Sequence, residues 1–215
     1  VIQYSLVSGA ADRLELSSYK ASANEPGYFE ASALFRPTPA PAAGATPKPK
    51  TVIALFDASL SMQWEKLEHS FRALEATLRS LTPQDKFNVV VYNSDIAPSA
   101  PAPVPATLEE VDKALTFVKT QRLRGMTNLQ AALGLALAQT GPDTYFVLLG
   151  DGAATRGLVQ TGKLAAWFNT QWRQKAADQR PRVYALAIGD DANAGLLRQL
   201  ARNQGVFEWI RSTEP

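Results

Sequence analysis

A short apolar run that ends in alternating oxygen-bearing side chains is the feature that most constrains this chain. Residues 52–56, Val-Ile-Ala-Leu-Phe, are uninterrupted hydrophobic residues, a run typical of a strand buried on both faces of a parallel sheet. Asp57, Ser59 and Ser61 follow it directly. Because ligands bind at the carboxyl ends of strands in open α/β sheets, this turn is a candidate binding site. One carboxylate and two hydroxyls suit Mg²⁺ or Mn²⁺.

Patterns typical of helices and strands alternate through the rest of the chain. An amphipathic helix is expected after the turn, because its apolar residues are three and four apart: Trp64, Leu67, Phe71, Leu74, Leu78 and Leu81. Trp64, close behind the serines, is either a core residue or a residue at the rim of the site. Further strands are expected at 85–92, 145–149, 183–188 and 206–210, with helical patterns between them. This alternation predicts an α/β fold with a doubly wound, mostly parallel six-stranded sheet and helices on both faces.

The connections carry turn and capping signals. Residues 97–106 are rich in Pro and Ala and are expected to form a loop. Thr107, with Glu110 three residues later, predicts the capped start of a helix. Asp190 and Asp191 are expected to cap the last helix rather than to hold a second metal ion.

The first part of the chain has a separate pattern. Residues 1–36 contain three short β-like segments divided by turn residues, which predicts a short N-terminal β extension. Because so few strands rarely stand alone, we expect them to pack on the main domain or to be the trailing strands of a preceding domain. Residues 37–50 are read as a Pro/Ala-rich linker, and residues 51–211 as the main domain.

Composition excludes some partners and some chemistry. The chain has 215 residues and a formal net charge of only +2, from 22 basic and 20 acidic residues, so nucleic acid and an anionic membrane are not expected as partners. It has no cysteine, which excludes disulfides and thiolate metal ligands. No segment is long and apolar enough to insert into a membrane, and the isolated chain is expected to be monomeric. Val1, in place of an initiator Met, indicates a processed chain or a fragment.

Two further turns carry oxygen-bearing side chains. Asp151 follows the strand at 145–149, and Thr127 lies in a Gly-containing turn before a helix. If the strands are neighbours, these side chains converge with those after residue 56 at one edge of the sheet. Two carboxylates repel each other unless a cation lies between them, and Mg²⁺ accepts such oxygen ligands while keeping several waters. The predicted metal ligands are Asp57, Ser59, Ser61, Thr127 and Asp151, with Mg²⁺ as the expected ion and Mn²⁺ or Ca²⁺ as alternatives.

These motifs carry a resemblance to a known family. Residues 51–210 resemble a von Willebrand factor A domain, because Asp57-x-Ser59-x-Ser61, Thr127 and Asp151 match that family's metal-ion-dependent adhesion site. The likeness is closer to the A domain of inter-α-trypsin-inhibitor heavy-chain-like proteins, on segments 87–95, 125–129, 151–157 and 188–193. In those proteins a β-rich domain precedes the A domain, and residues 26–29 resemble the strand that joins the two.

The resemblance implies a non-enzymatic adhesion or protein-interaction module. In family members that use the site, an acidic side chain of a partner protein completes the coordination of a Mg²⁺ ion, which hydroxyls hold directly and the aspartates partly through water. Two residues depart from the family pattern: Leu60 stands where Gly is usual, and Gly150 where Thr is often found. Leu60 is expected to crowd the turn or to narrow the approach to the metal.

Two other functions stay open, and so does the location. A scaffold domain with a vestigial or occluded metal site follows if Leu60 blocks access. A phosphotransfer enzyme would use Asp57 as its nucleophile, but Ser59 stands where a second carboxylate is usual, and no Lys lies just beyond the turns. A secreted, periplasmic or cell-surface location is expected, with a cytoplasmic one as the alternative.

Overall fold

Two compact units make up the chain, and each is described by itself. The computed structural model describes residues 13–19, 22, 24, 26–34 and 48–211, and the units divide between Pro47 and Lys48. In the first unit, β1 (Arg13–Tyr19) and β2 (Tyr28–Leu34) form an antiparallel pair. They fall where two of the three N-terminal β segments are expected. The remaining segment, at 1–6, lies outside the described residues, as does the expected linker up to residue 47.

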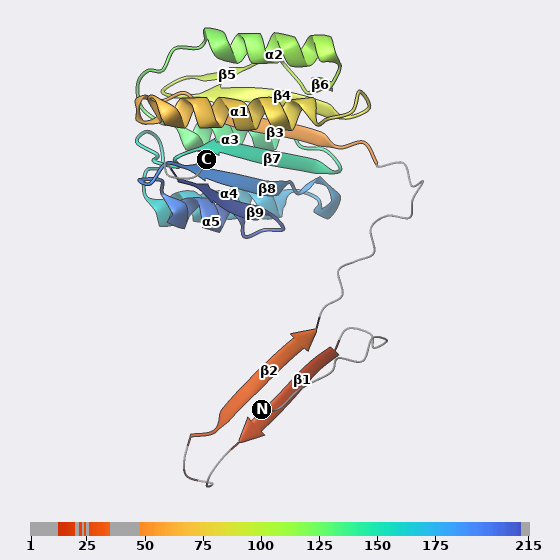
Figure 1. Cartoon of the computed structure of the whole chain (residues 1–215), viewed down its shortest axis with the longest axis vertical. Helices are drawn as coiled ribbons and strands as arrows, with labels where there is room; N and C mark the ends of the chain where they lie inside the picture. Colours follow the sequence, from red (N-terminus) through yellow and green to blue (C-terminus); the bar gives the residue numbers. More distant parts are fainter. Residues whose placement is uncertain (1–12, 20–21, 23, 25, 35–47, 212–215) are drawn as a thin grey trace, which may run out of the picture. The chain divides into compact units, whose positions relative to one another are not determined.

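The second unit is built around one sheet. Its main strands are parallel: β3 (Thr51–Asp57), β4 (Lys86–Tyr92), β7 (Thr144–Gly150), β8 (Arg182–Ile188) and β9 (Val206–Ile210). The strand order is β5-β4-β3-β7-β8-β9, with β6 also paired to β4. β4 lies on one side of β3 and the later parallel strands lie on the other, so the sheet is doubly wound (Figure 1). The predicted fold class is confirmed.

One edge of the sheet differs from the expectation. The segment predicted to be a loop contains two short strands, β5 (Ile96–Pro98) and β6 (Val104–Pro105), which pair antiparallel with β4. Both include a proline, which lacks an N–H group and is tolerated only at the edge of a sheet. The loop prediction is therefore wrong in part, and the sheet has seven strands where six were expected.

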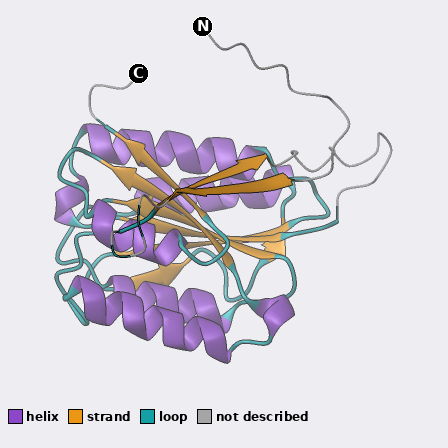
Figure 2. Cartoon of the chain, turned by 90° about the horizontal axis from the view of Figure 1, so that it is seen from below, coloured by secondary structure: helices purple, strands orange, loops and turns teal. Residues whose placement is uncertain are grey.

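Alternate strand residues supply two hydrophobic cores, one on each face of the sheet. On one face, Val52 and Phe56 pack with α1 (Glu65–Arg79) and α2 (Leu108–Thr120). On the other face, Ile53 and Leu55 pack with three helices: α3 (Leu129–Ala138), α4 (Thr161–Gln174) and α5 (Ala194–Ala201). The two helical layers enclose the sheet (Figure 2). Because both faces are covered, β3 is buried over nearly its whole length, as its apolar run predicts.

The first long helix starts later than its apolar pattern predicts. Trp64 is the residue before α1, with φ 65° and ψ −127°, and 85% of it is exposed. Leu74 and Leu78 are buried as expected. Placing Trp64 on the apolar stripe is wrong, because its backbone conformation takes it out of the helix.

Two helix starts test the capping predictions. Thr107 accepts a hydrogen bond from the Glu110 backbone N–H (3.3 Å), so the predicted cap of α2 is confirmed. α5 is capped by Asn193, whose side chain accepts from the Leu196 N–H (3.1 Å). The prediction that the aspartates at 190–191 cap this helix is wrong, since the helix begins only at residue 194. In the part of the chain that the structure describes, no helix combines the length and apolar character needed to cross a membrane.

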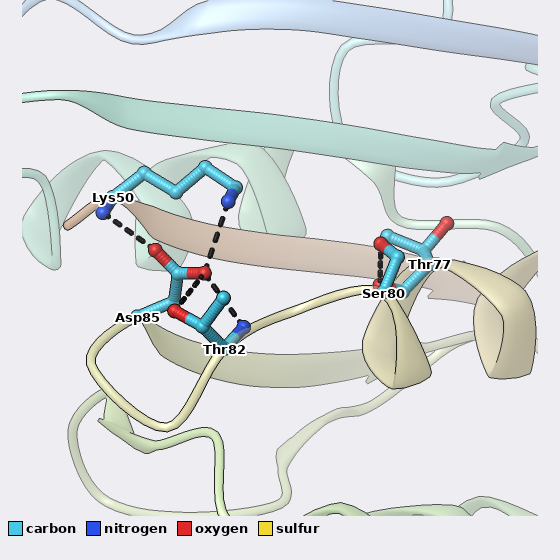
Figure 3. Close-up of polar contacts among 5 residues, drawn as sticks. All are labelled: Lys50, Thr77, Ser80, Thr82 and Asp85. Atoms are coloured by element: carbon cyan, nitrogen blue, oxygen red, sulfur yellow. Dashed lines mark hydrogen bonds and ion pairs between the residues drawn. The ribbon is translucent and has the colours of Figure 1, made fainter. Parts of the chain in front are cut away.

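At the amino edge of the sheet, a buried aspartate ties β3 to β4 (Figure 3). Asp85 accepts hydrogen bonds from the backbone N–H and Nζ of Lys50, both at 2.9 Å. It also accepts from the backbone N–H and the hydroxyl of Thr82, at 2.8 and 3.0 Å. Burial raises the pKa of Asp85, but these hydrogen bonds outweigh burial and lower it to about 2. In the same view, the Ser80 hydroxyl donates to the Thr77 carbonyl (2.7 Å) at the end of α1.

Candidate metal centre

The turn after β3 carries the first predicted ligands. Asp57 is the last residue of β3, and a short 3-10 helix, η1 (Leu60–Met62), follows it. The Ser59 backbone N–H donates to Asp57 Oδ1 (2.9 Å), and the hydroxyl oxygens of Ser59 and Ser61 lie 3.0 Å apart. The turn itself therefore brings these three side chains together.

Asp57 is the least satisfied member of the group. The residue is fully buried, and Oδ2 makes no well-formed hydrogen bond among the described residues. Burial raises the pKa of Asp57 to about 7, and the charge of Asp151 raises it too. Hydrogen bonding from Ser59 and, more weakly, the nearby Tyr92 hydroxyl opposes this rise. A buried carboxylate oxygen without a protein partner calls for another source of positive charge or a proton.

The loop before α3 reaches the same edge of the sheet. The Arg124 N–H donates to the Ala58 carbonyl (3.1 Å), and the Leu60 N–H donates to the Gly125 carbonyl (3.5 Å). This loop therefore lies against the turn after β3, and Thr127 follows in it as a buried residue. The backbone contacts bring the Thr127 segment beside the serines; its role as a ligand stays a prediction.

Asp151 directly follows β7, the strand next to β3. It is buried, and its Oδ1 accepts from the Ala153 N–H (2.9 Å). Its Oδ2 lies 3.5 Å from Nζ of Lys66, which also pairs with Asp191 at 2.5 Å. A side-chain cation thus stands beside one predicted metal ligand, and Asp191 pairs with the same cation.

Sequence reasoning missed Lys66. It lies in the first turn of α1, beyond the serine turn, and only the packing of α1 on the sheet brings it to Asp151. The apolar stripe of this helix indicates which face is buried, and a lysine outside that stripe is expected to be exposed to solvent. Only the position of the helix start relative to β7 could have identified Lys66 as part of the site.

The structure explains why Gly stands at position 150, which is one of the two departures from the family pattern. A Cβ atom on Gly150 would lie 2.8 Å from Asp57 Cβ and 3.0 Å from the Tyr92 hydroxyl. Tyr92 is fully buried, and its hydroxyl has no hydrogen-bond partner among the residues that the structure describes. Tyr92 therefore occupies space that a larger residue at position 150 would need. Its place in an apolar strand indicates only a core residue, so the sequence does not reveal this contact.

Leu60, the other departure, is 49% exposed. Its side chain lies at the surface, between the two serines along the chain. Its backbone N–H contacts the Gly125 carbonyl as described above, so the turn keeps its contact with the neighbouring loop despite the larger side chain.

The predicted ligand set depends on hydroxyls as much as on carboxylates. Within the described ranges, no group of three or more His, Cys, Asp or Glu could hold a metal ion. The set has only two carboxylates, Asp57 and Asp151, and the remaining protein oxygens come from serine and threonine. Oxygen ligands of this kind fit a hard divalent cation.

A doubly wound parallel sheet with helices on both faces defines an α/β domain, and the predicted ligands lie at the carboxyl edge, where sheets of this kind bind their ligands. The chain belongs to the von Willebrand factor type A domain family, whose model matches residues 50–207. The resemblance predicted from the motifs is confirmed.

Curated relatives and solved structures agree with this assignment. Inter-alpha-trypsin inhibitor heavy chain H4 of Homo sapiens is 30% identical over 173 residues, which are 75% of this chain and 18% of that protein. This chain therefore spans less than a fifth of the length of that relative. The von Willebrand factor type A structure from Catenulispora acidiphila matches with a TM-score of 0.63 and 18% identity, over 94% of this chain and 43% of that one.

Two similar structures are described with a bound metal. Proximal thread matrix protein 1 from the mussel byssus, with a zinc-occupied MIDAS motif, matches with a TM-score of 0.54 and 19% identity, over 74% of this chain and 43% of that one. The manganese-loaded TRAP protein of Plasmodium vivax matches with a TM-score of 0.54 and 15% identity, over 76% and 68% of the two chains. At these identities the likeness concerns the fold alone.

Proposed function

We propose that the second unit is a non-enzymatic, metal-dependent protein-interaction domain. Asp57, Ser59, Ser61, Thr127 and Asp151 hold a divalent cation, with Mg²⁺ the expected ion and Mn²⁺ or Ca²⁺ as alternatives. The cation supplies an open coordination position for an acidic side chain of a partner protein.

The observation that carries this proposal is the Oδ2 atom of Asp57. It is buried and has no partner among the described residues, and burial raises the pKa of Asp57 to about 7. A core aspartate with no role beyond packing would be satisfied by hydrogen bonds, as buried polar groups generally are. A cation at this position supplies the missing partner, and it also removes the repulsion between Asp57 and Asp151.

An open coordination position on the cation favours an anionic ligand. A divalent cation balances the carboxylates of Asp57 and Asp151, and Lys66, 3.5 Å from Asp151, is itself balanced by Asp191 at 2.5 Å. The formal charges of the loaded site therefore cancel. A carboxylate from outside is attracted by the cation itself, as an oxygen ligand that can replace one of its waters.

Calorimetric titration of the metal-stripped chain with MgCl₂ tests the proposal. We expect one binding site, which Asp57→Ala abolishes, while the variant keeps the circular dichroism spectrum of a folded α/β domain. Glu75→Ala, at an exposed salt bridge on α1, is the control and should bind as the wild type does. Unchanged Mg²⁺ binding in Asp57→Ala would contradict the proposal.

A scaffold domain with an occluded site is the first alternative. Its support is Leu60, which has a large side chain between Ser59 and Ser61. If Leu60 limits access, Leu60→Gly should leave Mg²⁺ affinity unchanged and raise the affinity for a carboxylate ligand. If neither Mg²⁺ nor a carboxylate binds to either protein, the scaffold function is favoured.

A phosphotransfer enzyme is the second alternative, and the Lys66–Asp151 contact is the observation that favours it. Such an enzyme would use Asp57 as nucleophile and Lys66 to bind phosphate. Turnover of p-nitrophenyl phosphate that Asp57→Asn abolishes would support this function over the binding function.

For the whole chain, we propose an arrangement like that of the heavy-chain relatives. Residues 51–211 are the A domain, residues 37–50 are a linker, and residues 1–36 are the end of a preceding β-rich domain. We propose a secreted, periplasmic or cell-surface location, with the isolated fragment monomeric. Limited proteolysis should cut first between residues 36 and 50, and release a fragment that still binds Mg²⁺.

A further inference from the structure

Trp64 is an outlier in both backbone and exposure. Its φ of 65° and ψ of −127° lie in a region that glycine adopts easily and that is strained for other residues. Its side chain is nevertheless the largest type of apolar side chain, and 85% of the residue is exposed. A tryptophan at this position does not stabilise the fold, because its side chain packs little, and exposing its apolar surface to water is unfavourable. Strain of this kind in a residue that the core does not need points to a function.

Trp64 forms part of the wall of an apolar groove beside the metal centre. The groove has a volume of about 330 Å³ and is lined on its apolar side by Leu67 and Phe71 of α1 and by Val118 and Leu123 from the end of α2 and beyond it. Ala58, which lies between Asp57 and Ser59 in the chain, also lines it. The groove therefore continues from the turn that carries the predicted ligands. We name it the Trp64 groove.

Other exposed apolar residues gather at the same turns. Leu60 is 49% exposed and stands between the two serines, and Met126 is 53% exposed and stands next to Thr127. Their loops are in contact, since the Leu60 N–H donates to the Gly125 carbonyl. Each of the two loops thus exposes one large apolar side chain directly beside a predicted ligand. Apolar contacts next to a buried charge are typical of the centre of a protein interface.

We propose that Trp64 and its groove bind an apolar side chain from the same partner segment that supplies the acidic group. The proposal rests on the proposed function, because the metal holds the acidic group. The charge favours one occupant: an anionic peptide segment, attracted by the cation, with a Leu-like or aromatic residue close to its acidic residue. Lys119 and Glu68 both line the groove. Glu68 is paired with Arg72, so Lys119, with Nζ 5.0 Å from the centre of the Phe71 ring, leaves a positive charge at the rim.

A peptide series tests the proposal. The probes are fluorescein-labelled Gly/Ser peptides with one central Asp, in which a single Leu is moved one position at a time, and one peptide without Leu. Binding is measured by fluorescence polarisation in MgCl₂ and in EDTA. We expect Mg²⁺-dependent binding that is about tenfold tighter for the best-placed Leu than without Leu, which is the effect of burying one such side chain.

Three variants assign the effect to the groove. Trp64→Ala should lose the tenfold preference for Leu and keep the affinity for Mg²⁺ alone. Trp64→Gly should lose the same preference while melting at the same or a higher temperature than the wild type, because glycine relieves the backbone strain. Leu108→Ala is the matched control, because Leu108 is also an exposed apolar residue (76%). Two residues before it, the Ala106 N–H donates to the Asp85 carbonyl, which places this part of the chain at the amino edge of the sheet, the edge opposite the predicted ligands. This variant should bind every peptide as the wild type does.

The outcomes separate the two proposals. Affinity that does not depend on the presence or position of Leu overturns the inference, as does a preference that Trp64→Ala retains. Absence of peptide binding in a protein that does bind Mg²⁺ also overturns it. If Mg²⁺ itself does not bind, the proposed function fails first. A blue shift of tryptophan emission on binding of the Leu peptide, absent in Trp64→Ala, would place the contact at this residue.

Discussion

Asp57 and Asp85 are both buried aspartates of the same sheet, yet their surroundings are opposite. Asp85, at the amino edge, receives hydrogen bonds from Lys50 and Thr82 on both carboxylate oxygens, and these lower its pKa to about 2 against the effect of burial (Figure 3). Asp57, at the carboxyl edge, has one satisfied oxygen and one without a partner among the described residues, and burial raises its pKa to about 7.

The difference separates a structural role from the proposed binding role. The Asp85 carboxylate is saturated by the chain, so it stabilises the fold and can accept little else. The Asp57 carboxylate is left incomplete next to Asp151, so its ionised form is unfavourable in the fold, and in the proposed function a cation completes it. One end of the sheet thus holds a carboxylate satisfied by the chain, and the other end holds the carboxylate that we propose binds metal.

The largest expected effect is a pH dependence of opposite sign for the two residues. The folded pKa of Asp57, about 7, lies above its ordinary value of 3.8. Its contribution to stability is therefore fully present below pH 4 and is lost as the pH rises through 7. In EDTA, the free energy of unfolding of the wild type should fall relative to that of Asp57→Asn by about 1.4 kcal/mol per pH unit in this window. Saturating Mg²⁺ should cancel the fall, because it stabilises the ionised form.

Asp85 gives the opposite window. Its pKa is lowered from 3.8 to about 2, so its contribution is present above pH 4 and is lost as the pH falls through 2. Urea unfolding at intervals from pH 2 to 8 measures both windows. A stability difference between the wild type and Asp57→Asn that stays flat from pH 4 to 8 would show that Asp57 is not held in an unfavourable environment.

The second effect is the loss of the saturated carboxylate. Asp85→Ala leaves the backbone N–H groups of Lys50 and Thr82 without their acceptor, and it should reduce the free energy of unfolding by about 3 kcal/mol. Asp112→Ala is the control, because its pair with Arg79 is exposed at 3.2 Å and should cost less than about 0.5 kcal/mol. Chemical denaturation measures both, and equal losses would remove the distinction between the two kinds of aspartate.

The third effect tests the packing around Asp57. Gly150→Ala places a Cβ atom 2.8 Å from Asp57 Cβ, so we expect a loss of about 2 kcal/mol in stability together with weaker Mg²⁺ binding. Gly162→Ala, in α4, meets nothing within 4 Å and should be neutral or slightly stabilising. Thermal unfolding and calorimetry measure the two properties. If Gly150→Ala is as well tolerated as Gly162→Ala, the close approach of β7 to Asp57 has no consequence.

The smallest effect concerns the lysine at the carboxyl edge. Lys66→Met removes a positive charge 3.5 Å from Asp151 and should raise the affinity for Mg²⁺ about threefold to tenfold. Lys113→Met removes a charge that pairs with Glu109 and Glu110 on α2, and should leave the affinity unchanged. An unchanged or weaker affinity in Lys66→Met would show that Lys66 does not compete with the cation.

The sequence by itself determined the order of the elements and the residue types of the site. The apolar run at 52–56, the helical spacing after it and the strand ends with acidic residues depend on local periodicity, which is visible in a linear chain. They predicted the α/β class, the doubly wound sheet and the family. Edge strands that contain proline, such as β5, were not predicted, because their sequence pattern is the same as that of a loop.

Only the tertiary structure decided how many hydrogen-bond partners each buried carboxylate has. The partners of Asp85 come from the residue before β3 and from the loop after α1, and the neighbours of Asp57 include Tyr92 of β4 and Gly150 of β7. Burial and hydrogen bonding depend on segments that meet only after folding, so two aspartates that each adjoin an apolar strand segment differ in pKa, which is about 2 for Asp85 and about 7 for Asp57. For the same reason the contacts of Lys66 and Tyr92 and the backbone strain of Trp64 emerged only from the fold, since they follow from positions in space rather than from spacing along the chain.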